Sequence, residues 1–485
     1  MFHGPRLAVR LSKLGPLGCK PVHFPVPLPF GPSAAILALF RTHNGGRIHT
    51  LFTPQQLFDE FGSSADVLAH APFLERARVE REHDREHPAR LALGAYVVAR
   101  LVDRLLSGLE GVEAREGFAW QVAAVRRHLG DLPGEAPEAA HLRGITEAVP
   151  SDPTPTPALR LCLTAYAYFL EHEARLDEAL DILGLAGRAH GVSVPADDFA
   201  SIALFAGRLN RLLARWVAAN TCYERAEDAA HSVSDVVTAL RSRLGRCAVL
   251  RGQGNLPLAL ANTRAVVDEA GRLGLREVQA MAYADLGSVC ANQGLRIEAV
   301  QANYQAFLLS EDSLQRMRVL GDLGVCLIGV GAPETARLAF EIVVDSNTSF
   351  HVRTNAVLEL MDLESSVGNR VAFERRRAQA EEVRDRMMPS LAADFHFKAG
   401  VGLARFGRFK RAKELLSVGL RLTEEHRLNL WYFRFENELK ALETLQASPS
   451  PEAREPEFAT PAAYSEWPAV DEVAVGLREY ALVKG

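Results

Sequence analysis

The stretch "LGSVCANQGLRIEA", residues 286–299, is matched 37 residues later by "LGVCLIGVGAPETA", residues 323–336. Both stretches begin with Leu-Gly, carry another glycine seven residues after that glycine, and place an alanine five residues further on. Small residues at matching intervals indicate a structural repeat, because each copy must make the same close contacts at the same places.

The same spacing recurs through the middle of the chain. From one aligned position to the next, the steps are 40, 40, 40, 37, 37 and 39 residues, which defines seven units. One unit has Ala214 in place of the turn glycine. A nearly constant step over seven units indicates a repeat array. The aligned positions are Ala179, Ala219, Ala259, Ala299, Ala336, Phe373 and Ala412.

Each unit is interpreted as a helix, a short turn and a second helix. The Leu-Gly pair allows two helices to cross closely, the later glycine accommodates the turn, and the alanine lies at the tightest crossing. Apolar residues four or five positions after the alanine, such as Tyr304, Phe340 and Leu416, fill the space between units. One helix pair cannot bury its own apolar face, so stacked units share a core.

This pattern resembles the tetratricopeptide repeat family, although its steps exceed the roughly 34 residues usual there. In repeat length it is similar to the helical-repeat regions of bacterial transcription activators of the maltose-regulon type. The resemblance covers residues 159–446 and implies an all-α fold, a right-handed superhelical solenoid of helix-turn-helix repeats. It also implies a concave face, lined by the first helix of each unit, where peptides or partner helices bind.

One position on that implied face is acidic in three successive units. These residues are Asp285, Asp322 and Glu359, with Asp362 one turn after Glu359, and Lys398 breaks the row in the next unit. Such a row favours a basic or amine-bearing protein or peptide partner. The alternative is an ordinary solvated helix face. The lysine/asparagine pair with which some family members hold a C-terminal carboxylate is missing at the corresponding places.

The flanking segments differ from the array in composition. Residues 1–58 are acid-free and proline-rich, which predicts a disordered extension, with a targeting segment or an overlong start as alternatives. A helical region is predicted over 59–130, a Pro-rich linker over 131–158, and an acidic Pro-rich tail with a short helix over 447–485. Front helices are predicted at about 64–86, 89–107 and 114–129, a capping helix at 427–445, and a tail-helix face of Val470, Val473, Leu477 and Tyr480.

Composition favours a folded cytoplasmic protein. The chain is 48% hydrophobic and 24% charged, and its net charge of -5 gives no field that favours nucleic acid or an anionic membrane. No apolar run is long enough for a transmembrane helix. The six scattered cysteines predict reduced, mostly buried thiols. Two basic stretches, 374–386 and 405–413, are interpreted as solvated helix faces, and the excess of arginine over lysine suggests a bacterial source.

The charged stretch "EREHDREHPAR", residues 80–90, contains His83-x-x-Glu86-His87, the H-x-x-E-H signature of inverted zinc peptidases. Two histidines four apart on one helix can share a metal ion, with the glutamate as general base. Pro88 argues against such a site, because a proline pushes the preceding residue out of the helical conformation. We therefore place a helix boundary at His87 and interpret the stretch as an exposed helix end.

No nucleotide-binding loop, nucleophile elbow or implied cofactor points to an enzyme. The sequence predicts a protein-interaction scaffold that binds a peptide or protein partner. The alternative is a regulator that responds to a ligand or peptide, and a zinc metallopeptidase comes third. A regulator would change its oligomeric state on binding, whereas a scaffold would hold its partner without such a change.

Overall fold

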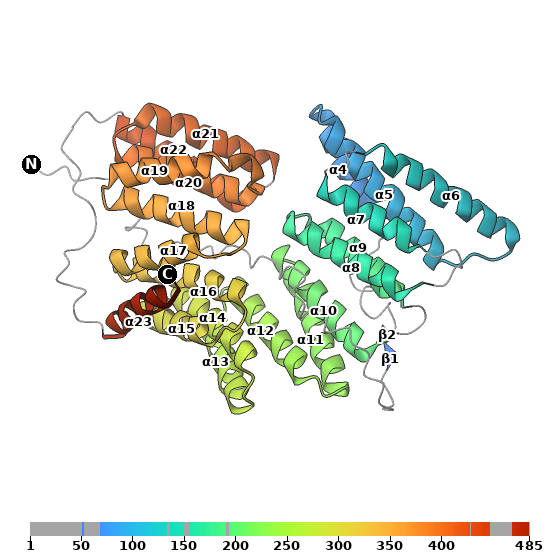
Figure 1. The fold of residues 1–485 in the computed structure, drawn as a ribbon, viewed down its shortest axis with the longest axis horizontal. Coiled ribbons are helices and arrows are strands. Elements are labelled where there is room, and N and C mark those ends of the chain that lie inside the picture. The colour runs from blue at the N-terminus through green and yellow to red at the C-terminus, as the bar shows by residue number, and fades with distance from the viewer. Residues whose placement is uncertain are drawn as a thin grey trace, which may run out of the picture. The chain divides into compact units, whose positions relative to one another are not determined.

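The computed structural model describes residues 51–52, 68–132, 136–149, 155–190, 194–426, 428–446 and 468–484. Nearly all of these residues are helical, which confirms the all-α prediction (Figure 1). The described residues form two compact units that divide between Asn255 and Leu256. We call them the N-terminal unit and the C-terminal unit.

The N-terminal unit consists of helix pairs and one short strand pair. Strands β1 and β2 are antiparallel, with Leu51 opposite Pro195 and Phe52 opposite Val194. The elements are β1 (Leu51–Phe52), α4 (Ala71–Glu82), α5 (Glu86–Leu106), α6 (Val112–Gly130), α7 (Pro137–Ala148), α8 (Pro157–His172), α9 (Leu176–Arg188), β2 (Val194–Pro195), α10 (Ala196–Leu212), α11 (Trp216–Ser232) and α12 (Val236–Gly252).

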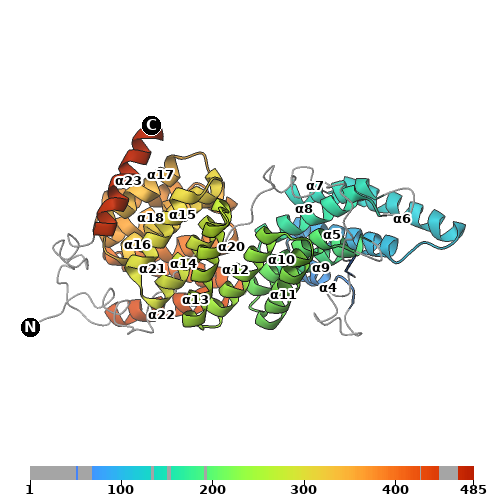
Figure 2. The same ribbon diagram turned by 90° about the horizontal axis from the view of Figure 1, so that it is seen from below.

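The C-terminal unit continues the array and ends with the tail helix (Figure 2). Its helices are α13 (Leu256–Arg272), α14 (Arg276–Gln293), α15 (Arg296–Leu309), α16 (Ser313–Gly329), α17 (Pro333–Asp345), α18 (Phe350–Ser366), α19 (Arg370–Glu381), η1 (Arg384–Arg386), α20 (Pro389–Arg405), α21 (Phe409–Glu425), α22 (Asn429–Gln446) and α23 (Pro468–Lys484). Helix α22 packs on α21 and α20, as expected of the predicted capping helix.

The seven predicted repeats correspond to the helix pairs α8/α9, α10/α11, α12/α13, α14/α15, α16/α17, α18/α19 and α20/α21. All seven aligned alanine or phenylalanine positions are buried, in agreement with their predicted place at the crossings. The unit boundary falls inside the α12/α13 repeat. We call the members of each pair its first and second helix.

The turn inside each repeat has one geometry. Its central residue has a positive φ, which glycine adopts without strain. The following residue donates its N–H to the carbonyl five residues earlier, at 2.8–2.9 Å, as in a Schellman turn. The central residues are Gly254, Gly294, Gly331, Gly368 and Gly407, with φ of 73–82°, and Ala174 and Ala214, with φ of 58° and 55°.

The H-x-x-E-H stretch forms a turn of this same kind. Helix α4 ends at Glu82 and α5 begins at Glu86, and Asp84 between them has a φ of 56°. The predicted boundary at His87 is therefore wrong by a few residues. Pro88 lies inside the first turn of α5, where its missing N–H costs no intrahelical hydrogen bond. Because the turn separates His83 from His87, the two histidines do not share a helix face.

The α4/α5 pair follows the repeat spacing further than the sequence revealed. Ala89 comes five residues after Asp84, as Ala179 comes five residues after Ala174, and Ala89 is buried. Residues 59–130 thus contain a repeat-like helix pair, with Asp84 in place of the glycine.

Helix α7 lies within 131–158, so the prediction of a linker is wrong for residues 137–148. Its buried Glu138 accepts hydrogen bonds from Arg76 (2.9 Å), Arg175 (2.6 Å) and the hydroxyl of Tyr166 (2.8 Å). Burial alone would raise the pKa of Glu138, but the charges of Arg175 and Arg76 hold it below its usual value. These contacts fix α7 against α4, α8 and α9.

Helix α23 packs on α15 and α17 through the predicted face (Figure 1). Val470, Val473 and Leu477 are buried in one core with residues of α14 to α18. Tyr480 lies edge-on to Phe307, with ring centroids 5.0 Å apart. The tail helix therefore covers the second helices of two repeats.

Other predictions concern residues that the structure describes only in part. Of residues 1–58 only Leu51 and Phe52 are described, and they form a strand rather than a disordered segment; the rest, with Cys19, lies outside the described residues. The remaining five cysteines are free, and four of them are buried, as expected: Cys222, Cys247, Cys290 and Cys326.

Candidate binding site

The predicted acidic residues lie on three successive first helices. Asp285 is on α14, Asp322 on α16, and Glu359 and Asp362 are on α18. All four are half-buried. Their partner-binding role stays a prediction.

Glu359 and Asp362 form ion pairs with the next first helix, α20. Lys398 Nζ lies 2.7 Å from Glu359 Oε1 and 2.7 Å from Asp394 Oδ2. Arg405 Nη1 donates to Asp362 Oδ1 at 2.6 Å and to Ser365 Oγ at 2.6 Å. The lysine that interrupts the acidic row in the sequence therefore neutralises part of it in space.

The charges in this region shift one another's pKa values. Burial alone would lower the pKa of Lys398, but Asp394 and Glu359 raise it above its usual value. Burial raises the pKa of Glu359, and the charge of Lys398 opposes that rise. The pairs are thus strong charge-assisted contacts between α18 and α20.

A third cation comes from the capping helix α22. The guanidinium of Arg434 lies 4.3 Å from the ring centroid of Trp431 and 4.5 Å from that of Phe397. Burial lowers its pKa, whereas the nearby carboxylates, Asp394 first among them, oppose the change. We call these residues the C-terminal charge cluster: Glu359, Asp362, Asp394, Lys398, Arg405 and Arg434.

The N-terminal unit carries a second polar group that the sequence did not predict. Arg208 on α10 donates from Nη2 to Glu171 Oε2 of α8 at 2.5 Å. Its guanidinium lies 4.9 Å from the ring centroid of Phe205 and 5.6 Å from that of Tyr168. The repeat spacing offered a signal for this contact, since Tyr168 and Arg208 are one 40-residue step apart and so occupy equivalent positions on adjacent first helices.

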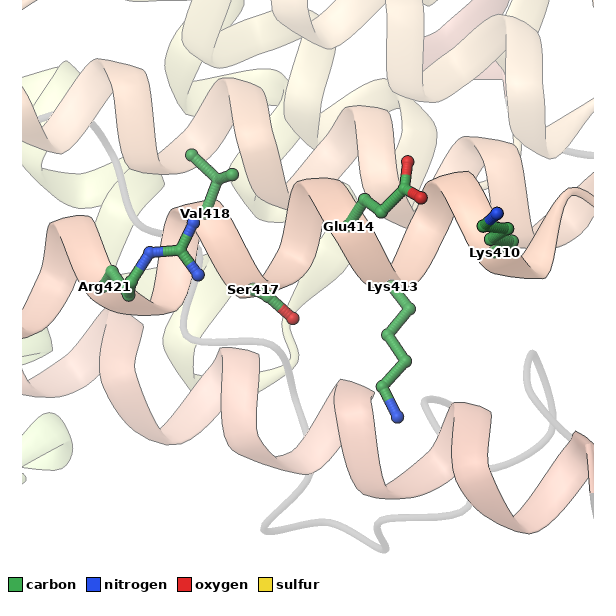
Figure 3. A pocket seen from close by; sticks show the side chains of 6 residues that line it. All are labelled: Lys410, Lys413, Glu414, Ser417, Val418 and Arg421. Carbon is green, nitrogen blue, oxygen red and sulfur yellow. The ribbon is translucent and has the colours of Figure 1, made fainter.

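A shallow surface pocket lies on α21 and contains no residue of the two charged groups described above. Its lining residues all come from this one helix, with side chains that point outward (Figure 3). Lys413 forms an ion pair with Glu443 of α22 at 3.0 Å. Exposed charges on one helix fit the solvated face predicted for this part of 405–413. The lining residues are Lys410, Lys413, Glu414, Ser417, Val418 and Arg421.

Metal-binding clusters and membrane-spanning helices are two further features that bear on function. Within the ranges described above, no group of three or more His, Cys, Asp or Glu side chains could hold a metal ion. None of the helices in the described part of the chain combines the length and apolar character needed to cross a membrane.

No protein-family model matches the sequence, and no curated protein matches it. Solved structures resemble it in fold. The apo quorum sensor NprR from B. thuringiensis has 11% identity and a TM-score of 0.44, over 73% of this chain and 97% of that one. NprR in complex with its cognate peptide NprX has 13% identity and a TM-score of 0.42, over 76% and 98%.

The apo form of RapI has 12% identity and a TM-score of 0.42, over 55% of this chain and 98% of that one. At these identities and scores, the likenesses assign no ligand or partner to this chain. The likeness in repeat length to the maltose-regulon activators stays a prediction.

Proposed function

We propose that this chain is a helical-repeat interaction protein that binds a peptide or a protein segment along the first helices of its repeats. One observation carries the proposal: buried or half-buried charged side chains lie on each of the first helices α14, α16, α18 and α20 and on α22 of the C-terminal unit. Partly buried charges orient a bound segment more strongly than fully solvated ones.

The position of the tail helix agrees with this assignment. Helix α23 packs on the second helices α15 and α17, so its apolar face is buried against that side of the repeats. A partner that uses the first helices does not have to displace it.

The partner proposed for the C-terminal unit is basic or amine-bearing. Glu359 and Asp362 already face Lys398 and Arg405. Asp285 and Asp322 occupy the same place in the row on the two preceding first helices, and we propose them as contacts together with Glu359 and Asp362. Glu359 and Asp362 contribute when a cation of the ligand replaces Lys398 or Arg405.

The test uses the purified full chain and an array of short peptides of random sequence. Asp322→Lys should weaken binding of lysine- and arginine-rich peptides about tenfold or more, because it removes one charge-assisted contact and adds repulsion. Glu298→Lys on the second helix α15, which makes the same charge change at an exposed place, should leave binding unchanged. Unchanged binding to Asp322→Lys would exclude the acidic row as the contact.

Sedimentation with and without a bound peptide distinguishes a regulator from an adaptor. A change of oligomeric state on binding supports a regulator, and an unchanged state supports an adaptor.

A further inference from the structure

Four residues of the N-terminal unit form what we call the arginine–aromatic cluster: Tyr168 on α8, Phe205 and Arg208 on α10, and Arg241 on α12. The rings of Tyr168 and Phe205 are stacked, with centroids 4.2 Å apart and an interplanar angle of 14°. Arg208 lies against both rings. These contacts hold its guanidinium in one orientation.

Arg208 still has unused hydrogen-bonding capacity. Its Nη2 donates to the buried Glu171, but its Nε is buried and has no hydrogen-bond partner among the described residues. A guanidinium carries five N–H donors, so this one contact leaves most of them unused.

Arg241 lies on the adjacent first helix, since α12 packs on α10. It is half-buried, and no described residue forms a hydrogen bond or an ion pair with it. Burial lowers its pKa; the charge of Arg208 adds to this change, and the charge of Asp235 opposes it.

Two other groups of buried cations are matched by carboxylates in direct contact. Arg76 and Arg175 share Glu138 and Glu178. Lys398 likewise faces two carboxylates, Glu359 and Asp394. At the arginine–aromatic cluster two arginines have one hydrogen-bonded carboxylate, Glu171, and the charge of Asp235 acts on Arg241 without an ion pair or a hydrogen bond between them. A partly desolvated cation without a contacting counter-ion is costly, which favours an anion supplied from outside.

The chemistry of the cluster favours a carboxylate. Guanidinium forks donate two parallel hydrogen bonds to a planar carboxylate. One arginine without a contacting carboxylate fits one singly charged carboxylate better than a doubly charged phosphate, which would leave an excess of negative charge. The stacked rings of Tyr168 and Phe205 offer an apolar surface to the carbon chain beside it.

We infer that Arg241, together with Arg208 on the first helix packed against its own, binds a carboxylate of a peptide partner, either its C-terminal group or an Asp or Glu side chain. This inference rests on the proposed function, because it names the ligand group that the first helices of the N-terminal unit recognise.

The experiment compares Arg241→Met with the wild-type full chain on peptide arrays that carry either free or amidated C-termini. Arg241→Met should weaken binding about tenfold or more, because one charge-assisted contact is lost. Replacing the responsible carboxylate in the peptide, by amidation or by Asp→Asn or Glu→Gln, should cause the same loss and add nothing further in the Arg241→Met chain.

Arg246→Met is the matched control on the same helix. Arg246 is half-buried like Arg241 but pairs with Glu224 and Glu227 of α11, so its loss should leave peptide binding unchanged. Arg241→Lys, which keeps the charge and loses the fork, should bind with intermediate affinity.

Thermal unfolding without peptide gives an independent readout. If Arg241 is kept for a ligand, Arg241→Met unfolds at the wild-type temperature or above it, because a cation without a contacting counter-ion is gone. Unfolding several degrees lower would show a structural arginine and overturn the inference.

The remaining outcomes are also distinct. A wild-type chain that binds no peptide contradicts the proposed function itself. Binding that survives both Arg241→Met and removal of peptide carboxylates contradicts only this inference. Competition by inorganic phosphate as strong as by the peptide would assign the cluster to a phosphate group and overturn the carboxylate.

Discussion

Gly324 on α16 lies where this first helix crosses its second helix, α17. A Cβ atom at this position would lie 2.5 Å from Cε1 of the buried Phe340, which is too close for any side chain. The same relation, with a partner sixteen residues later, recurs along the array. The pairs are Gly207–Tyr223, Gly287–Asn303, Gly324–Phe340 and Gly400–Leu416. The glycine at this position, which belongs to a Leu-Gly pair in two of the four repeats, therefore sets the distance between the two helices of a repeat.

Gly324→Ala should lower the free energy of unfolding by about 1–3 kcal/mol, because the added methyl overpacks a filled crossing. Gly321→Ala on the same helix is the control, since a Cβ there meets nothing within 4 Å. That control should be neutral or stabilising by up to about 1 kcal/mol. Urea unfolding of both variants measures the difference, and equal midpoints would show that the crossing is not tight.

His396 on α20 is buried, and its Nδ1 has no hydrogen-bond partner among the described residues. Burial, with a contribution from the charge of Arg384, lowers its pKa from 6.5 to about 4. Because the folded state disfavours the protonated ring, the neutral ring contributes stability above pH 6.5. That stability is lost as pH falls toward and through 4.

The expected loss attributable to His396 is up to about 3 kcal/mol, from 2.5 pKa units at about 1.36 kcal/mol each. His396→Gln should therefore lose less stability than the wild-type chain between neutral pH and roughly pH 4. Chemical denaturation at several pH values measures this. Parallel pH profiles for the two chains would mean that the ring is not held neutral by the fold.

At the scale of elements, α23 is a helix whose position comes from one apolar face. Leu477 is fully buried against α15 and α17, whereas Val475 is 50% exposed. Gly476 between them lies against Tyr304, whose hydroxyl oxygen would be 2.0 Å from an added Cβ. The face and the glycine together bring the helix close to the repeats.

Leu477→Asp should release α23, because a buried carboxylate without a partner costs more than one apolar contact provides. Amide hydrogen exchange in residues 468–484 should then accelerate by at least about tenfold, with the rest of the C-terminal unit still protected. Val475→Asp makes the same chemical change on the exposed side and should leave the exchange rates unchanged. Protection that persists in Leu477→Asp would mean that α23 is held by other contacts.

Helix α7 is an element that the local sequence pattern did not predict. Prolines around 133–157 indicate a linker, and the helical segment between them is short. What holds α7 in the fold is Glu138, whose partners Arg76, Tyr166 and Arg175 lie 62, 28 and 37 residues away. Contacts over such separations leave no local pattern in the sequence.

At the scale of the whole molecule, one repeat frame supports two different chemistries. The position of Asp285 in the C-terminal unit corresponds, 80 residues earlier, to Phe205 in the N-terminal unit. The first helices of the C-terminal unit therefore carry acids and their counter-ions, whereas those of the N-terminal unit carry arginines on aromatic rings. The repeats provide the scaffold, and single substitutions on the first helices determine what each unit can bind.

The sequence alone determined the helices of the repeats, the repeat step, most of the turn residues and the apolar face of α23. These depend on spacing over a few residues, which secondary structure translates directly into geometry. It also placed Asp285, Asp322, Glu359 and Asp362 on first helices. The turn at Asp84 was predicted a few residues late, because Pro88 was expected to follow a helix end and instead lies in the first turn of α5.

Only the tertiary structure decided which charges meet and how deeply they are buried. It paired Glu359 with Lys398, left Arg241 without an ion pair among the described residues, and placed α23 on second helices. The physical reason is that the energy of a charge depends on its distance to other charges and on its exposure to water. Both are set by packing between helices that are far apart in the chain.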